Sequence, residues 1–158
     1  MQIEYYYYNS PIGILEIELK NNVVLGLKVV ESCDNISEVT GYFAQVAKQL
    51  DEYFAGKRTK LELNIYPKGT EFQKKVWAEL LKIPYGKTKS YQEIAEAIGK
   101  PSAQRAVGSA CNKNTILLII PCHRVISKTG KLTGYACGVH RKEQLLKMES
   151  NQCFQDNL

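Results

Sequence analysis

The sequence predicts an α+β protein: a three-stranded antiparallel sheet with one covering helix, then a mostly helical half that contains a short buried strand. Three patterns indicate this fold class. Residues 2–30 alternate between apolar and polar side chains, which is typical of half-buried strands. Residues 39–54 and most of residues 70–111 follow a helical period instead. The run 116–120 is apolar throughout, rich in isoleucine and too short for a buried helix, so it predicts a strand hidden on both faces.

Composition limits the class of protein. A chain of 158 residues fits one domain or two small ones, and the turn signal Pro67-Lys-Gly69 predicts two domains, 1–68 and 69–158. With 44% hydrophobic and 23% charged residues, the chain is an ordinary globular protein. It has no apolar run near the ~20 residues of a membrane span and no signal-peptide pattern, so we expect no membrane association and a cytoplasmic location.

Charge and cysteine content point to the partner and the compartment. The net charge of +5 and the pI of about 8.9 suit a polyanionic partner, although solvated surface lysines would give the same values. Five cysteines, an odd number without CxxC spacing, argue against a disulfide framework or a zinc finger and favour a reducing compartment.

In the first half, strand alternation is clearest at residues 15–20, and Asn21-Asn22 is a hairpin signal because Asn tolerates left-handed angles. The next strand is expected at 23–30. Asn35 with Glu38 predicts a capping box for the covering helix, which should end at Ala55-Gly56. The apolar stripe of that helix is Val39, Tyr42, Phe43, Val46, Leu50, Tyr53 and Phe54. Core and sheet surface explain the tyrosines at 5–8 better than a binding role, and 61–65 alternates as a further strand.

The second half contains two capping boxes, Thr70 with Gln73 and Ser90 with Glu93, each opening a helix. Gly99 stops the second of these. Pro101 is placed to start another helix that runs to about Cys111. Two short helices around a glycine-containing turn predict a helix-turn-helix, although many helical bundles contain such a pair.

The last of these helices carries few long side chains. Gln104, Arg105 and Ser109 are its polar residues, and the rest of the helix is mainly alanine and glycine. A sequence-specific repressor would place several base-reading side chains here. Small residues instead allow a close approach to DNA without reading its sequence, or they pack the helix tightly inside the protein. The sequence leaves both interpretations open.

Cys122 follows the predicted strand 116–120 directly after Pro121, and His123 and Arg124 come next. A thiol at the end of a rigid buried segment is pre-placed for chemistry, and the positive charge of Arg124 would favour the thiolate. The alternative is that Cys122 is a small buried hydrophobe. A direct bond between the cysteine and the histidine requires a turn at Pro121, and otherwise a bridging water.

The stretch Pro121-Cys-His-Arg-Val125 resembles the active-site motif of the O6-alkylguanine-DNA alkyltransferases. The resemblance covers residues 69–149 closely and the N-terminal half loosely. Its further motifs, in chain order, are Gly69-Thr-Glu-Phe-Gln73, Ile83-Pro-Tyr-Gly86, Ser90-Tyr91, Arg105-Ala-Val-Gly108, Gly134-Tyr135, Arg141-Lys142 and Leu145-Leu146.

The resemblance implies a ribonuclease H-like N-terminal domain and a DNA-repair activity. Such a protein flips O6-alkylguanine, and also O4-alkylthymine, out of double-stranded DNA and transfers the alkyl group irreversibly to its own cysteine. It is consumed after one turnover and needs no cofactor. The resemblance also implies a monomer that associates with DNA, in the nucleus if the host is eukaryotic.

The same resemblance implies the roles of individual residues. Cys122 is the nucleophile, His123 takes its proton, Glu149 orients the imidazole, and Asn114 braces the turn. Tyr91 helps to rotate the nucleotide, Arg105 fills the gap in the duplex, and Tyr135 donates to the leaving base. The other candidate substrate or DNA contacts are Ser90, Gln104, Ser109, Arg124 and Cys137. Without the family, a solvated Glu149, a surface Arg105 and a core Tyr91 would be the default interpretations.

Two positions depart from the family pattern. Thr115 stands where the family has proline, which should affect unfolded-state entropy by ~0.5–1 kcal/mol and not the chemistry. Cys137 stands where the family has glycine, in Tyr135-Ala136-Cys137-Gly138, and puts the pocket width in question. Some members carry an N-terminal zinc site, but Cys33 has no His or Cys neighbours, so we expect no metal.

Three other classes compete with the alkyltransferase. A non-transferring lesion sensor shares the scaffold but lacks the cysteine, so the presence of Cys122 disfavours it. A helix-turn-helix repressor is disfavoured by the alanine- and glycine-rich helix. A cysteine hydrolase is disfavoured because no glycine-rich nucleophile loop or oxyanion donor is evident.

Overall fold

The computed structural model describes residues 2–130, 132, 134, 135 and 137–156, and it confirms the predicted α+β class. The chain clusters into two compact units, Met1–Pro67 and Lys68–Leu158. Among the described helices, none combines the length and the hydropathy needed to cross a membrane.

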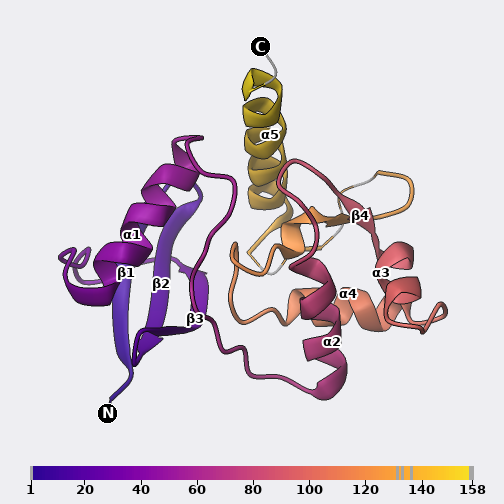
Figure 1. Ribbon diagram of the computed structural model, residues 1–158, viewed down its shortest axis with the longest axis horizontal. Coiled ribbons are helices and arrows are strands. Elements are labelled where there is room, and N and C mark those ends of the chain that lie inside the picture. Colours follow the sequence, from indigo (N-terminus) through magenta and orange to yellow (C-terminus); the bar gives the residue numbers. More distant parts are fainter. Residues whose placement is uncertain (1, 131, 133, 136, 157–158) are drawn as a thin grey trace. The chain divides into compact units, whose positions relative to one another are not determined.

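The first unit contains the predicted antiparallel sheet, in the order β1-β2-β3 (Figure 1). Its strands are β1 (Glu4–Ser10), β2 (Gly13–Lys20) and β3 (Val23–Val30). Asn21 and Asn22 both adopt positive φ angles, 53° and 61°, and form the tight turn between β2 and β3. Leu15, Ile17 and Leu19 are buried as the alternation predicted, because they share one face of β2.

Helix α1 (Gly41–Phe54) covers this sheet and buries Phe43, whose ring stacks on Tyr6 with centroids 4.6 Å apart. The predicted capping box at Asn35 and Glu38 is wrong, since the helix begins after Thr40. The reason lies in a long-range contact. Ser37 binds the edge of β1 at Tyr7 through its backbone N–H (3.0 Å) and its Oγ (2.8 Å), so this segment is held extended. Val39 consequently lies outside the helix and is exposed.

The strand expected at residues 61–65 is reduced to one isolated bridge. Ile65 pairs in parallel with Val24, supported by bonds from Val24 N to Asn64 O (2.8 Å) and from Tyr66 N to Val24 O (3.0 Å). Among the described residues, the outer edge of β3 is therefore paired at this bridge alone.

The second unit is built on α2 (Glu71–Leu80), α3 (Tyr91–Ala97) and α4 (Gln104–Asn112). Both predicted capping boxes are confirmed, Thr70 with Gln73 and Ser90 with Glu93. Helix α4 begins three residues after Pro101, because Ala103 N bonds to Lys100 O (2.9 Å) in a preceding turn. The buried Trp77 joins α2 to α4 by donating its Nε1–H to Ala110 O (2.9 Å).

Four further elements complete the described part of this unit. The two-residue strands β4 (Lys89–Ser90) and β5 (Val125–Ile126) pair in parallel. The 3-10 helix η1 (Cys122–Arg124) precedes β5, and α5 (Val139–Asp156) follows the last loop. The parallel pair thus joins the start of α3 to the end of η1, the segment that contains the candidate nucleophile.

Candidate active site

The buried run before the cysteine is a turn, so the predicted strand at 116–120 is wrong although its burial is right. Its backbone bonds are local, from Ile119 N to Leu117 O (2.8 Å) and from Ile120 N to Ile116 O (3.1 Å). Leu118 adopts a φ of 70°, in the left-handed region that a branched apolar residue rarely adopts. The neighbouring Asn114 makes this geometry possible.

The side chain of Asn114 closes the turn at both ends. Its Oδ1 accepts from Ile116 N (2.9 Å), and its Nδ2 donates to Ile120 O (2.7 Å). The same Nδ2 lies 3.2 Å from Cys122 Sγ. One buried carboxamide therefore bonds the backbone at both ends of the turn and also contacts the thiol.

Cys122 is the first residue of η1 and is only 3% exposed. Burial raises the pKa of its thiol to about 12, although the bond from Asn114 and the nearby Lys142 act in the opposite direction. At neutral pH the resting group is therefore a thiol and not a thiolate. It needs a base to become a nucleophile.

His123 is fully buried and points at a carboxylate, with its Nε2 2.8 Å from Glu149 Oε2. Because Glu149 is ionised, this nitrogen carries the proton, and Nδ1 has the lone pair. Nδ1 makes no hydrogen bond to any of the described residues. The turn at Pro121 thus separates the two side chains, and no direct bond between Cys122 and His123 is present among the described contacts.

Glu149 is almost completely buried on α5 and accepts bonds from three residues, His123, Arg124 and Gly86. Arg124 reaches it with two nitrogens, Nε to Oε1 (2.8 Å) and Nη2 to Oε2 (3.0 Å), and Gly86 N lies 3.4 Å from Oε1. Burial alone would raise the pKa of this carboxyl, but the hydrogen bonds from His123 and Arg124 and the positive charge of Arg124 hold it far below its usual range. Glu149 is therefore not the solvated surface glutamate that the sequence would suggest without the family resemblance.

Arg124 occupies a position that the sequence did not predict. We expected it to favour the thiolate and to contact substrate or DNA, but its guanidinium is buried and bound to Glu149 and to Ile83 O (2.8 Å). An arginine so engaged does not reach a DNA backbone. The preference of guanidinium for a two-pronged carboxylate contact explains the inward orientation.

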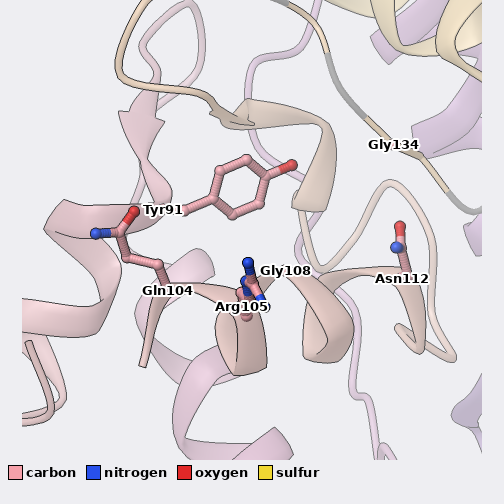
Figure 2. Close-up of a pocket in the computed structure, with 6 residues that line it drawn as sticks. All are labelled: Tyr91, Gln104, Arg105, Gly108, Asn112 and Gly134. Atoms are coloured by element: carbon pink, nitrogen blue, oxygen red, sulfur yellow. The ribbon is translucent and has the colours of Figure 1, made fainter. Parts of the chain in front are cut away.

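An open cavity of about 350 Å³ lies beside this cluster, between α3, α4 and the loop before α5 (Figure 2). Its lining residues are Tyr91, Gln104, Arg105, Gly108, Asn112 and Gly134. Figure 2 shows Tyr91 above the helix that carries Arg105, with Asn112 farther along that helix. The helix presents Gln104, Gly108 and Asn112 at intervals of four residues, so they lie on one helical face, and glycine in the middle keeps that face open.

Lys142 contacts Tyr91 and Gly134 of the cavity lining and lies near the Cys122 thiol. The motif Arg141-Lys142 did not predict this position for the lysine. Its side chain is fully buried, and its Nζ donates to Tyr91 Oη (3.4 Å) and to Gly134 O (3.3 Å). Burial lowers its pKa, while the neighbouring Cys122 and Cys111 thiols raise it. Lys142, Leu145 and Glu149 share one buried face of α5, so a helical period through Leu145 would have identified the lysine.

Tyr135 and Cys137 belong to the loop between β5 and α5. Tyr135 is 8% exposed, and its ring meets the His123 ring edge to face, with centroids 6.4 Å apart. Cys137 is half-buried, and burial raises the pKa of its thiol, while Arg141 and a hydrogen bond from the side chain of Tyr135 lower it. The sulfur of Cys137 therefore lies against the tyrosine. Ala136, between them, is outside the described residues.

The remaining candidates lie on α3 and α4. Ser90 is the N-cap of α3 and accepts from Glu93 N (3.0 Å). Gln104 donates to Gln92, whereas Ser109 and Arg105 are exposed. Cys33 belongs to the first unit. Within the described part of the chain, no group of three or more potential ligands could hold a metal ion.

Comparisons with known protein families and curated proteins give matches over most of the chain. Two family models match, one described as the ribonuclease-like domain of 6-O-methylguanine DNA methyltransferase at residues 3–67 and one as its DNA binding domain at residues 71–151. A methylated-DNA–protein-cysteine methyltransferase of Methanosarcina barkeri is 50% identical over 148 residues, covering 90% of this chain and 94% of that protein. The Mycobacterium tuberculosis protein of the same name is 43% identical over 159 residues, covering 98% and 96%.

Solved structures are also similar to this chain over most of its length. The crystal structure of Mycobacterium tuberculosis O6-methylguanine methyltransferase superposes with a TM-score of 0.86 at 42% identity, covering 96% of this chain and 94% of that chain. A crystal structure of the mycobacterial protein in complex with DNA has a TM-score of 0.86 at 45% identity, covering 94% and 93%.

Proposed function

The chain belongs to the 6-O-methylguanine DNA methyltransferase family and is a DNA-repair methyltransferase, and from this premise we propose that Cys122 is its alkyl acceptor. The observation that carries the assignment is the arrangement around the thiol. Asn114 Nδ2 lies 3.2 Å from Sγ, and the adjacent His123 is oriented by Glu149 at 2.8 Å. No other described cysteine is followed by an imidazole held in this way.

The proton leaves Cys122 for His123 as the sulfur attacks. Because the pKa of the thiol is raised to about 12, attack without a base would be slow at neutral pH. Nδ1 of His123 has the lone pair that accepts the proton, through one water, and Glu149 stabilises the imidazolium that forms. The sulfur–carbon bond forms while the bond from the alkyl carbon to guanine O6 breaks.

The base leaves as a neutral species when Tyr135 donates its hydroxyl proton to it, and the proton held by His123 passes through solvent to restore the phenol, so that protons and charge balance. The product is a thioether, whose carbon–sulfur bond none of the described groups of the site can hydrolyse. Each molecule is therefore consumed by one lesion. The same geometry fits O4-alkylthymine, whose alkyl carbon also sits on an exocyclic oxygen.

Double-stranded DNA is the proposed partner, and the lesion reaches the thiol by rotation out of the helix. In-line attack needs space behind the alkyl carbon, which a stacked base pair does not provide. The cavity lined by Tyr91, Arg105 and Gly108 is open to solvent, and Tyr91 in its wall accepts a hydrogen bond from the buried Lys142 (3.4 Å). A monomer that associates with DNA fits these features, and none of them calls for a membrane or a cofactor.

Intact-mass measurement tests this function. Incubation with an oligonucleotide carrying O6-methylguanine should add one methyl group per protein molecule, located on the peptide that contains Cys122. A matched oligonucleotide without the lesion is the control. A protein that binds the methylated duplex without gaining mass would be a lesion sensor or a repressor.

The thiol of Cys137 leads to a prediction about substrate size. We expect Cys137 to narrow the pocket beside the alkyl group, because its sulfur lies against Tyr135. A benzyl donor should then clash, and overpacking of this kind costs ~1–3 kcal/mol, or about 5- to 150-fold in rate. Inactivation by O6-benzylguanine should therefore be slow, and Cys137→Gly should recover much of the rate with methyl transfer little changed.

The rate of inactivation by the benzyl donor and the rate with the methyl donor are measured for the wild type and each variant, and their ratio reports the width of the pocket. Cys137→Ala is the matched control, since it removes the sulfur and keeps the backbone restrained. It should recover part of the benzyl rate. If neither variant reacts faster with the benzyl donor than the wild type, Cys137 points away from the alkyl group.

A further inference from the structure

Arg124 is a buried cation whose donors are directed at the site and not at solvent. Its Nε and Nη2 bind the two oxygens of Glu149 at 2.8 and 3.0 Å, and its Nη1 donates to Ile83 O at 2.8 Å. The guanidinium carbon also lies 5.8 Å from the centroid of the Tyr85 ring. These contacts fix the orientation of the guanidinium completely, which is more than a solvated arginine requires.

One carboxylate oxygen serves two residues. Glu149 Oε2 contacts both His123 Nε2 (2.8 Å) and Arg124 Nη2 (3.0 Å). A buried carboxylate is stable as an anion only when a positive charge is close to it. Arg124 supplies that charge here. In its absence, the nearest group able to become cationic in contact with Glu149 is the imidazole of His123.

The charge on His123 decides whether it can act as a base. The titratable and charged side chains around it come from three segments: Cys122 and Arg124 in η1, Tyr135 in the following loop, and Lys142 and Glu149 in α5. Burial lowers the pKa of His123, Glu149 raises it, and Arg124 and Lys142 lower it. The direction that results is a lowered pKa, and so a neutral imidazole at pH 7.

We propose that Arg124 is a positioning residue that keeps His123 neutral, because its guanidinium balances the charge that Glu149 would otherwise draw onto the imidazole. The proposal rests on the proposed function, in which His123 accepts the proton of Cys122. An imidazole kept protonated by the negative charge of Glu149 would hold the carboxylate equally well but could not accept that proton. The arginine therefore separates two tasks: it neutralises the glutamate, and it leaves the histidine available.

The first test is the pH dependence of Cys122 methylation, measured by mass with O6-methylguanine as the free base so that DNA binding does not contribute. In Arg124→Gln we expect the acid limb of the rate profile to move to a higher pH by about one unit or more. At pH values below the limb, the methylation rate should then be about tenfold lower than that of the wild type, or lower still. Activity should return as the pH is raised. Arg124→Lys keeps the charge and should keep the acid limb near that of the wild type.

The matched control is a variant that removes the arginine of an arginine–glutamate ion pair outside the site. Arg58 pairs with Glu52 at 3.0 Å in the first unit, and Arg58→Gln should leave the pH profile unchanged. If Arg124→Gln is folded and loses the same factor at every pH, Arg124 has only a structural role and the proposal is wrong.

A second measurement needs no variant. The chain has two histidines, and histidine nitrogen NMR at several pH values follows the buried His123 separately from the exposed His140. In the wild type, His123 should be neutral at pH 7 with its proton on Nε2, and it should titrate below the usual value of about 6.5. A charged His123 at pH 7 overturns the proposal even if Arg124→Gln does not fold. This readout does not depend on methyl transfer, so failure of the proposed function is recognised separately by mass.

Discussion

Replacing Cys122 with alanine is expected to abolish methyl transfer and to leave DNA binding close to that of the wild type. The thiol is only 3% exposed, so its removal changes little of the surface that meets DNA. Asn114 loses its contact with Sγ but keeps the bonds to Ile116 and Ile120 that close the turn. We therefore expect a stability change of only ~1 kcal/mol, typical of a single truncation.

Three measurements decide this prediction: protein mass after incubation with methylated DNA, loss of methyl from the DNA, and affinity for the methylated duplex by fluorescence anisotropy. Cys33→Ala is the control, because that thiol is half-buried in the first unit and should be dispensable. If the Cys122 variant still removes methyl from DNA, another group is the acceptor. The buried Cys111, whose pKa is raised by burial and by the nearby Cys122, would then be examined first.

Elements whose signals are local were predicted well. The capping boxes at Thr70 and Ser90 form because each needs only four consecutive residues. The alternation of β2 and the Asn21-Asn22 turn define a hairpin with little help from the rest of the chain. In these segments the local preference and the packing of the core agree.

The failures share one cause, which is a polar side chain whose bonds to the backbone cannot be read from the sequence pattern. Ser37 binds the edge of β1 and delays helix α1, although Asn35 and Glu38 have the spacing of a cap. Asn114 turns the apolar run 116–120 into a loop, although its composition favours a strand. A pattern of hydrophobic residues reports burial and does not report which polar group satisfies the backbone.

The candidate site divides in the same way. The adjacency of Cys122 and His123 suggested reactivity from the sequence alone, whereas the partnership with Glu149 followed only from the family resemblance. The inward orientation of Arg124 and the burial of Lys142 were not predicted. Charged residues are usually exposed, and only the three-dimensional contacts show that these two are not.

Replacing Arg105 with alanine should slow methyl transfer from duplex DNA strongly and transfer from the free base very little. Arg105 is exposed at the rim of the cavity below Tyr91 and forms no ion pair with any described side chain, so its guanidinium is available to a ligand (Figure 2). Small residues surround it on α4, which leaves it as the long cation able to enter a duplex. Only the duplex has a gap to fill once the lesion has rotated out.

The expected loss on duplex DNA is about 10- to 150-fold, since a hydrogen bond from a charged group contributes ~1.5–3 kcal/mol. Single-turnover rates with methylated duplex and with O6-methylguanine base measure the two effects. Lys113→Ala is the matched control: it removes one exposed positive charge at the end of α4, does not line the cavity, and should weaken binding to damaged and undamaged DNA alike. A loss of equal size on duplex and free base in Arg105→Ala would show that the residue supports the fold or the thiol. A loss confined to the duplex, and larger than that of the lysine variant, is the result that base flipping requires.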